Sequence, residues 1–217
     1  MPKTTIPPPL VDIIFLDIDG VLLPFGDNSH ILGGGGDLHQ TYTSGCIFPD
    51  STMEALSTLL MTLDDMRLRG MMMNAKIVLS SSWRSHQKLV RDILTSFQSF
   101  AKSRAARDKK ISMVLENTFS CGSEGYEFFD VTDTKYHSTR HDEIINWIEC
   151  AKTNGASEFL IRSWIALDDE DIVTVEGRKM NDSIGHAVQT LSTVGLTLRE
   201  VNVAIRLLEK QVQEYSR

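Results

Sequence analysis

The sequence predicts an α/β domain in which helices cover both faces of a central parallel sheet. Short, continuous apolar segments at 13–16, 75–79 and 164–167 alternate with longer amphipathic segments, as expected when buried parallel strands alternate with helices. Polar residues able to bind a ligand follow each of these apolar segments at once. Because ligands of such sheets bind at the carboxyl ends of the strands, these polar residues should meet at one edge of the sheet.

Length and composition indicate an ordinary globular protein. The chain has 217 residues, enough for one domain with a full hydrophobic core. Its formal net charge of −7 argues against non-specific nucleic-acid binding over the whole surface, although a local basic patch stays compatible with it. Three cysteines without CxxC spacing indicate reduced thiols. Pro7 to Pro9 stand where a signal peptide would need an apolar run, and no apolar stretch is long enough to cross a membrane, so we expect a soluble cytoplasmic protein.

The predicted domain spans 11–217 and contains two inserts. Residues 1–10 form a proline-rich, flexible lead. Residues 24–48 are glycine-rich and weakly patterned, which indicates a mobile loop or small flap. Residues 116–138 are polar and contain two glycines, which indicates a second insert.

Helices are predicted where apolar residues recur at spacings of three or four. The segments with this pattern are 49–63, about 86–100, about 139–153 and 198–214. The basic run 102–110 is expected to be a solvated helix end or loop, and the apolar run 111–115 is expected to be a third strand.

Asp17 and Asp19 follow the first predicted strand directly. Two carboxylates one residue apart can reach one point beyond the sheet edge, where they repel each other unless a cation neutralises them. An oxygen-rich cluster of this kind suits Mg²⁺. Asp-x-Asp-Gly is also good turn chemistry, so a turn without a ligand is the alternative. The preceding buried strand favours the functional interpretation.

Asp168 and Asp169 follow another apolar strand. A lone Asp-Asp at this place often caps the next helix. Since the first acidic cluster should lie at the same edge of the sheet, completion of a metal site is the favoured interpretation.

The third polar cluster follows the strand at 75–79 and consists of Ser80, Ser81 and Ser82, with Trp83 and Arg84 next. A hydroxyl at a strand end, followed by a helix start, can bind a phosphate oxygen with help from backbone amides. Arg84 could add a bidentate phosphate contact. The alternatives to a phosphate site are that a serine only caps the following helix and that Trp83 belongs to the hydrophobic core.

These segments resemble the motifs of the haloacid dehalogenase (HAD) superfamily. Residues 15–22 match its first motif, a hydrophobic strand followed by Asp-x-Asp-Gly, while 77–84 resemble its second motif and 164–169 its acidic fourth motif. The pattern also includes the segment 140–148 and Gly195-Leu196-Thr197 before the last helix, and it resembles the HAD domain of Swiss Army Knife RNA repair proteins. The resemblance implies a three-layer, Rossmann-like HAD fold with small flap or cap inserts.

The resemblance also implies roles for the acidic residues. Asp17 would be the nucleophile that attacks phosphorus, and Asp19 would protonate the leaving group and then activate water. Mg²⁺ would be held by the Asp17 carboxylate, the Asp19 main-chain carbonyl and Asp169, with Asp168 close behind or as the alternate ligand.

The remaining roles are less specific. The phosphate-binding hydroxyl is expected from Ser81, with Ser80 or Ser82 as alternatives. The basic residue of the third motif is expected to be Arg140, with Lys135 and Lys110 as alternatives. Further substrate contacts are expected from Gly20, Ser80, Ser82 and Arg84. His141, beside Arg140, is the only histidine kept as a candidate.

The predicted function is a Mg²⁺-dependent phosphatase that hydrolyses a phosphomonoester through an aspartyl-phosphate. Its partner would be a small phosphorylated substrate or a nucleic-acid end. The alternatives are a catalytically silent binding or regulatory module and a phosphotransferase with an acceptor other than water.

Overall fold

The computed structural model describes residues 8–25, 42–71, 75–122, 125–133, 138–153, 159–175 and 177–216. Most of the predicted lead 1–10 and of the flap 24–48 lies outside these residues, as do parts of the insert 116–138, including Lys135.

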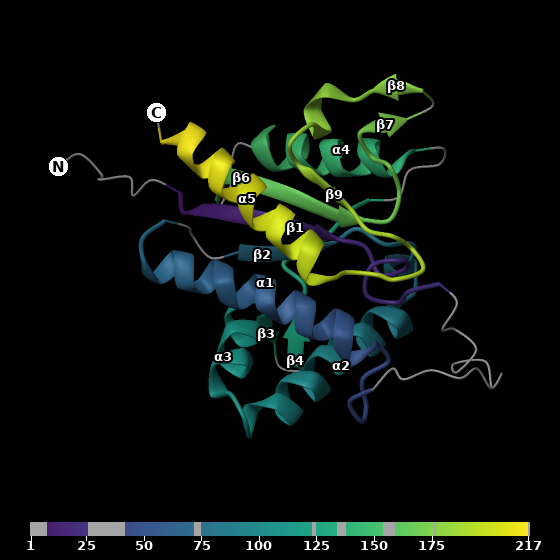
Figure 1. The fold of residues 1–217 in the computed structure, drawn as a ribbon. Helices are drawn as coiled ribbons and strands as arrows, with labels where there is room; N and C mark the ends of the chain where they lie inside the picture. The colour runs from purple at the N-terminus through teal and green to yellow at the C-terminus, as the bar shows by residue number, and fades with distance from the viewer. Residues whose placement is uncertain are drawn as a thin grey trace.

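A parallel sheet forms the centre of the domain (Figure 1). Its strand order is β5-β2-β1-β6-β9. The strands are β1 (Leu10–Leu16), β2 (Ala75–Leu79), β5 (Asp130–Val131), β6 (Leu160–Asp168) and β9 (Ala187–Gln189). After β1 the chain builds the sheet outward on one side, and from β6 onward it builds the other side. The order therefore reverses between β1 and β6, which is where ligands bind in sheets of this type.

Strand register brings the three polar clusters to the same level. Leu16 at the end of β1 pairs with Leu79 on β2 and with Leu167 on β6. The pairing continues one residue further, because the Asp17 amide donates to the Leu167 carbonyl at 3.0 Å and the Ser80 amide donates to the Leu16 carbonyl at 2.9 Å.

Helices cover both faces of the sheet, so the predicted three-layer α/β/α architecture is confirmed. On one face, alternate β1 residues such as Ile14 and Leu16 pack in a core with α1 (Asp50–Leu68) and α5 (Leu198–Tyr215). On the other face, Ile13 and Phe15 pack with Trp147 and neighbouring residues of α4 (Arg140–Thr153). In Figure 1, α4 lies above the sheet and α1 below it.

The prediction of a strand at 111–115 is wrong. These residues lie in α3 (Lys109–Thr118), which packs against α1 and α2 (Gln87–Ala105). Asp108 caps the helix by accepting from the Lys110 amide, and Val114, Leu115 and Thr118 are buried while Met113 is 61% exposed. That spacing fits a helix, since a strand would place Met113 and Leu115 on one face. The edge beside β2 is occupied instead by β5, from the predicted insert.

The other described parts of the inserts are short. The insert at 116–138 also contributes a hairpin of β3 (Ser120–Gly122) and β4 (Gly125–Glu127). Between β6 and β9 lie a hairpin of β7 (Thr174–Val175) and β8 (Arg178–Lys179) and the 3₁₀ helix η2 (Asn181–Ser183), which the sequence analysis did not predict. Among the described residues, no helix is both long and apolar enough to cross a membrane.

Candidate active site

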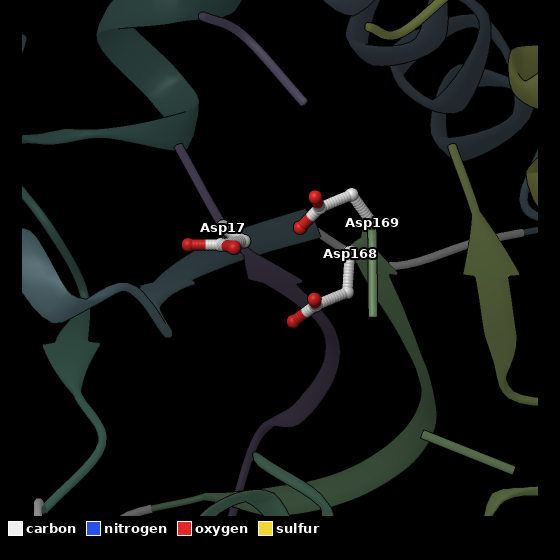
Figure 2. A group of neighbouring side chains, drawn as sticks. All are labelled: Asp17, Asp168 and Asp169. Atoms are coloured by element: carbon white, nitrogen blue, oxygen red, sulfur yellow. The ribbon is translucent and has the colours of Figure 1, made fainter. Parts of the chain in front are cut away.

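Three aspartates meet at the carboxyl ends of the two central strands. Figure 2 shows Asp17 beyond the end of β1, beside Asp168 and Asp169 from the end of β6. One carboxylate oxygen of each residue lies within 4.8 Å of the other two. The structure thus brings together three of the four residues predicted to bind a metal.

Burial makes it costly in free energy to keep all three carboxylates ionised. Asp17 is 4% exposed and Asp168 is 2% exposed. Loss of solvent raises the pKa of Asp17 to about 6 and, together with the charge of Asp17, raises the pKa of Asp168 to about 8. The pKa of Asp169 is also raised, first by burial and then by neighbouring carboxylates. A cation placed among the three would relieve this cost, and their oxygen-only donor set fits a hard ion such as Mg²⁺.

Gly20 allows this close arrangement. Its φ is +67°, and a Cβ atom at this position would lie 2.4 Å from the Asp169 carboxyl carbon. Thr190 holds the Gly20 carbonyl with a hydrogen bond of 2.8 Å. Any side chain at position 20 would therefore collide with a predicted metal ligand, which explains why the turn after Asp19 needs glycine.

Arg140, the first residue of α4, reaches this cluster. Its Nε lies 3.1 Å from Asp168 Oδ2, and its Nη2 lies 3.7 Å from Asp17 Oδ1. Burial alone would lower the pKa of this guanidinium, but the carboxylates of Asp17, Asp168 and Glu143 offset that effect and raise it. Of the three residues considered for the third motif, Arg140 lies beside Asp17, Lys110 pairs with Asp65 on α1, and Lys135 is outside the described residues.

Glu143, which no sequence motif indicated, connects Arg140 to Arg84. Its Oε2 atom lies 3.1 Å from Arg140 Nη1 and 2.7 Å from Arg84 Nη2. The Arg84 side chain is 4% exposed, and burial lowers its pKa. In this structure Arg84 therefore contacts Glu143, and its phosphate contact stays a prediction. The only sequence signal for Glu143 is its place one turn after Arg140 on the same helix.

The serine run divides into three environments. Ser80 is fully buried, and in the described part of the chain its hydroxyl has no hydrogen-bond partner. Ser81 is also fully buried; its hydroxyl hydrogen-bonds with Asp17 and accepts from the Trp83 amide at 3.4 Å as the cap of the 3₁₀ helix η1 (Ser82–Ser85). Ser82 is exposed. Ser81 is thus the serine of this run that contacts Asp17 among the described residues, and its phosphate-binding role stays a prediction.

Asp19 points elsewhere. Its Oδ2 accepts a hydrogen bond of 2.9 Å from the indole Nε1 of Trp83, and its carboxylate is not part of the three-aspartate cluster. That is compatible with the prediction that Asp19 binds metal through its main-chain carbonyl, which stays a prediction.

A pocket of about 610 Å³ opens beside Arg140. It is lined by η1, the start of α4 and the segment from Glu170 to Val175. Hydroxyl side chains are frequent in it: Ser82, Ser85, Ser138, Thr139 and Thr174. His141 also lines it, and its Nδ1 lies 2.7 Å from the Ser183 hydroxyl, a contact that links α4 to η2.

Comparison with known proteins agrees with this geometry. Residues 13–201 match the family described as the HAD domain in Swiss Army Knife RNA repair proteins. The chain belongs to this HAD family. Searches of curated proteins and of solved structures found no match. The matched segment contains every candidate residue above, and membership in a HAD family supports a hydrolase-type enzyme in general.

Proposed function

We propose that this HAD domain is a Mg²⁺-dependent phosphatase that hydrolyses a phosphomonoester through an aspartyl-phosphate on Asp17. The observation that carries the proposal is the cluster of Asp17, Asp168 and Asp169 with Arg140 beside it, at the switch point of the sheet. The positive charge of Arg140 beside the buried Asp17 carboxylate would reduce the repulsion between this carboxylate and an anionic phosphate.

The proposed reaction has two chemical steps. In the first step an Asp17 oxygen attacks phosphorus, the bond from phosphorus to the leaving oxygen breaks, and Asp19 gives that oxygen its proton. In the second step Asp19 takes a proton from water, the water oxygen attacks phosphorus, and the bond to Asp17 breaks to release phosphate. Arg140 and Ser81 would bind phosphate oxygens, and their contacts with Asp17 support these roles.

Mg²⁺ would be held by Asp17, Asp169 and the Asp19 carbonyl, with Asp168 beside it. When bound, the ion supplies charge neutralisation for the phosphoryl group. Arg140 pairs with Asp168 and so holds that neighbouring carboxylate in place.

The leaving group has room in the pocket beside Arg140, which at about 610 Å³ is larger than the phosphate alone requires. The family description names RNA repair proteins, which supports a nucleotide or a polynucleotide end as the phosphomonoester.

Asp17→Asn is the test of this function. The substrates are an aryl phosphate, a set of nucleotides and oligonucleotides with a 3′- or 5′-phosphate, each assayed with Mg²⁺ and with a chelator. We expect turnover by the wild type with Mg²⁺ only, and a loss of more than about a thousandfold in Asp17→Asn.

Asp65→Asn is the matched control, because it makes the same change at an α1 carboxylate that pairs with Lys110 outside the site. It should keep wild-type turnover. A folded wild type that binds Mg²⁺ but turns over none of these substrates would contradict the phosphatase proposal and favour a binding module. Equal turnover by Asp17→Asn would contradict Asp17 as the nucleophile.

A further inference from the structure

We propose that Trp83 is a positioning residue that holds the Asp19 carboxylate apart from the metal-binding aspartates, in the orientation from which Asp19 serves the leaving group. This inference rests on the proposed function. It assigns a role to a tryptophan whose sequence position is equally compatible with a place in the core.

The contact is directional. Trp83 Nε1 donates to Asp19 Oδ2 at 2.9 Å, which joins η1 to the turn after β1 across 64 positions of sequence. An indole N–H is a donor only, so this hydrogen bond has one possible polarity. The bond therefore favours one rotamer of Asp19.

Trp83 itself is firmly held. Ser81 caps η1 by accepting from the Trp83 amide, and the Trp83 carbonyl accepts from the His86 amide at 3.1 Å. The ring packs against the main hydrophobic core. The indole is thus fixed by the same turn that carries the phosphate-binding serine, and it can orient a neighbouring side chain.

Asp19 needs such an anchor because its carboxylate has a competing position. Asp17, two residues earlier, joins Asp168 and Asp169 in the cluster, whereas the Asp19 carboxylate does not. A cation held by those three residues would attract a freely rotating Asp19 carboxylate toward itself. An Asp19 carboxylate that moved there would leave the leaving oxygen without its proton donor.

Trp83→Phe tests this role because it keeps an aromatic ring and removes the N–H donor, and the Trp147→Phe control accounts for the smaller ring. The measurement is kcat/KM, which reports steps up to phosphoryl transfer, on two substrates with different leaving groups. A nitrophenolate leaves without a proton, whereas an alkoxide needs one. We expect kcat/KM to fall about tenfold or more for an alkyl phosphate, and by less than about threefold for the nitrophenyl ester.

Trp147→Phe is the matched control. The Trp147 indole donates to Asp130 Oδ2 at 2.8 Å, so this variant loses the same kind of hydrogen bond between α4 and β5. It should change kcat/KM equally and slightly for both substrates. A Trp83→Phe variant with an equal loss on both esters, or with no loss, would overturn the inference while leaving the phosphatase proposal intact.

A double variant sharpens the assignment. If Trp83 acts through Asp19, adding Trp83→Phe to Asp19→Asn should cost no further activity on the alkyl ester. A further tenfold loss in the double variant would show that Trp83 acts on another part of the site.

A measurement on the folded wild type guards against a Trp83→Phe variant that does not fold. The chain has three tryptophans, so ¹⁵N-labelled protein gives three indole N–H resonances. The Trp83 resonance should move in Asp19→Asn while that of Trp147 stays in place. An unmoved Trp83 resonance would overturn the inference. Absence of turnover in the wild type would instead overturn the proposed function, on which this role depends.

Discussion

Buried aspartates lie at both ends of the pair of central strands, β1 and β6, and their surroundings differ between the two ends. At the amino end, Asp12 of β1 is 1% exposed. Arg162 of β6 donates to both of its oxygens, with Nε at 3.0 Å and Nη2 at 2.6 Å, and Ser163 donates a third hydrogen bond of 2.7 Å. At the carboxyl end, Asp17 and Asp168 are similarly buried, and the Arg140 guanidinium lies beside both of them.

The difference is in how far the protein itself neutralises each buried carboxylate. One carboxylate with a bidentate arginine and a hydroxyl is neutralised by the protein itself, so it needs nothing from solution. Arg140 is shared by Asp17, Asp168 and Glu143, and the pKa values of both aspartates are raised by burial. When these carboxylates are ionised, the carboxyl end therefore carries an excess of negative charge that a metal ion can neutralise.

Arg162→Met is the change with the largest expected effect on stability. It leaves Asp12 buried without its guanidinium, so we expect the free energy of unfolding to fall by about 3–5 kcal/mol, measured by urea denaturation. The double variant Asp12→Leu/Arg162→Met removes both charges and should recover most of that loss. A loss below about 1 kcal/mol in Arg162→Met would contradict the structural role of the pair. Folded Arg162→Met should keep the wild-type kcat.

The contrast between the two ends could be predicted from the sequence only in part. Asp17, Asp168 and the serine run were predictable because each follows directly after an apolar strand, and parallel register then places them side by side. The pairing of Asp12 with Arg162 was not predicted, since its partners are 150 positions apart and neither interrupts a local pattern.

The direction in which each side chain points also could not be predicted from the sequence. Asp17 and Asp19 are separated by one residue, yet Asp17 joins the three-aspartate cluster and Asp19 contacts Trp83. Glu143 has an ordinary place on an amphipathic helix, and only the packing of α4 on the sheet shows that it binds two arginines. The error at 111–115 has a related cause, because a short apolar run fits a helix or a strand until its burial is known.

The pH dependence of stability is the second way to test the contrast. The pKa of Asp17 is raised from 3.8 to about 6, so the folded metal-free protein binds this proton more tightly than the unfolded chain does. The resulting stability is fully present below pH 3.8 and is lost as the pH rises through about 6 for Asp17 and about 8 for Asp168. For Asp17 alone the loss is about 3 kcal/mol, at about 1.4 kcal/mol per pKa unit.

Urea denaturation from pH 4 to pH 8.5 in chelator measures this loss. Asp17→Asn removes the titrating group, so its stability should decline less over the same range, and at pH 8.5 it should exceed that of the metal-free wild type. A wild type whose stability rises with pH across this window, or parallels that of Asp17→Asn, would contradict the raised pKa.

Addition of Mg²⁺ has the smallest expected effect on stability, because the gain rises only with the logarithm of the Mg²⁺ concentration relative to Kd. At a hundred times Kd, binding to the folded state alone raises the free energy of unfolding by about 2.7 kcal/mol. The ion and the protons compete for the same carboxylates, so the stabilisation at a fixed Mg²⁺ concentration should be larger at pH 8 than at pH 5. Asp17→Asn should lose most of it, while Asp65→Asn, with its carboxylate on α1, should retain it. Equal stabilisation of all three proteins would mean that Mg²⁺ binds elsewhere, and the excess charge at the carboxyl end would then have to be neutralised by Arg140 and protons alone.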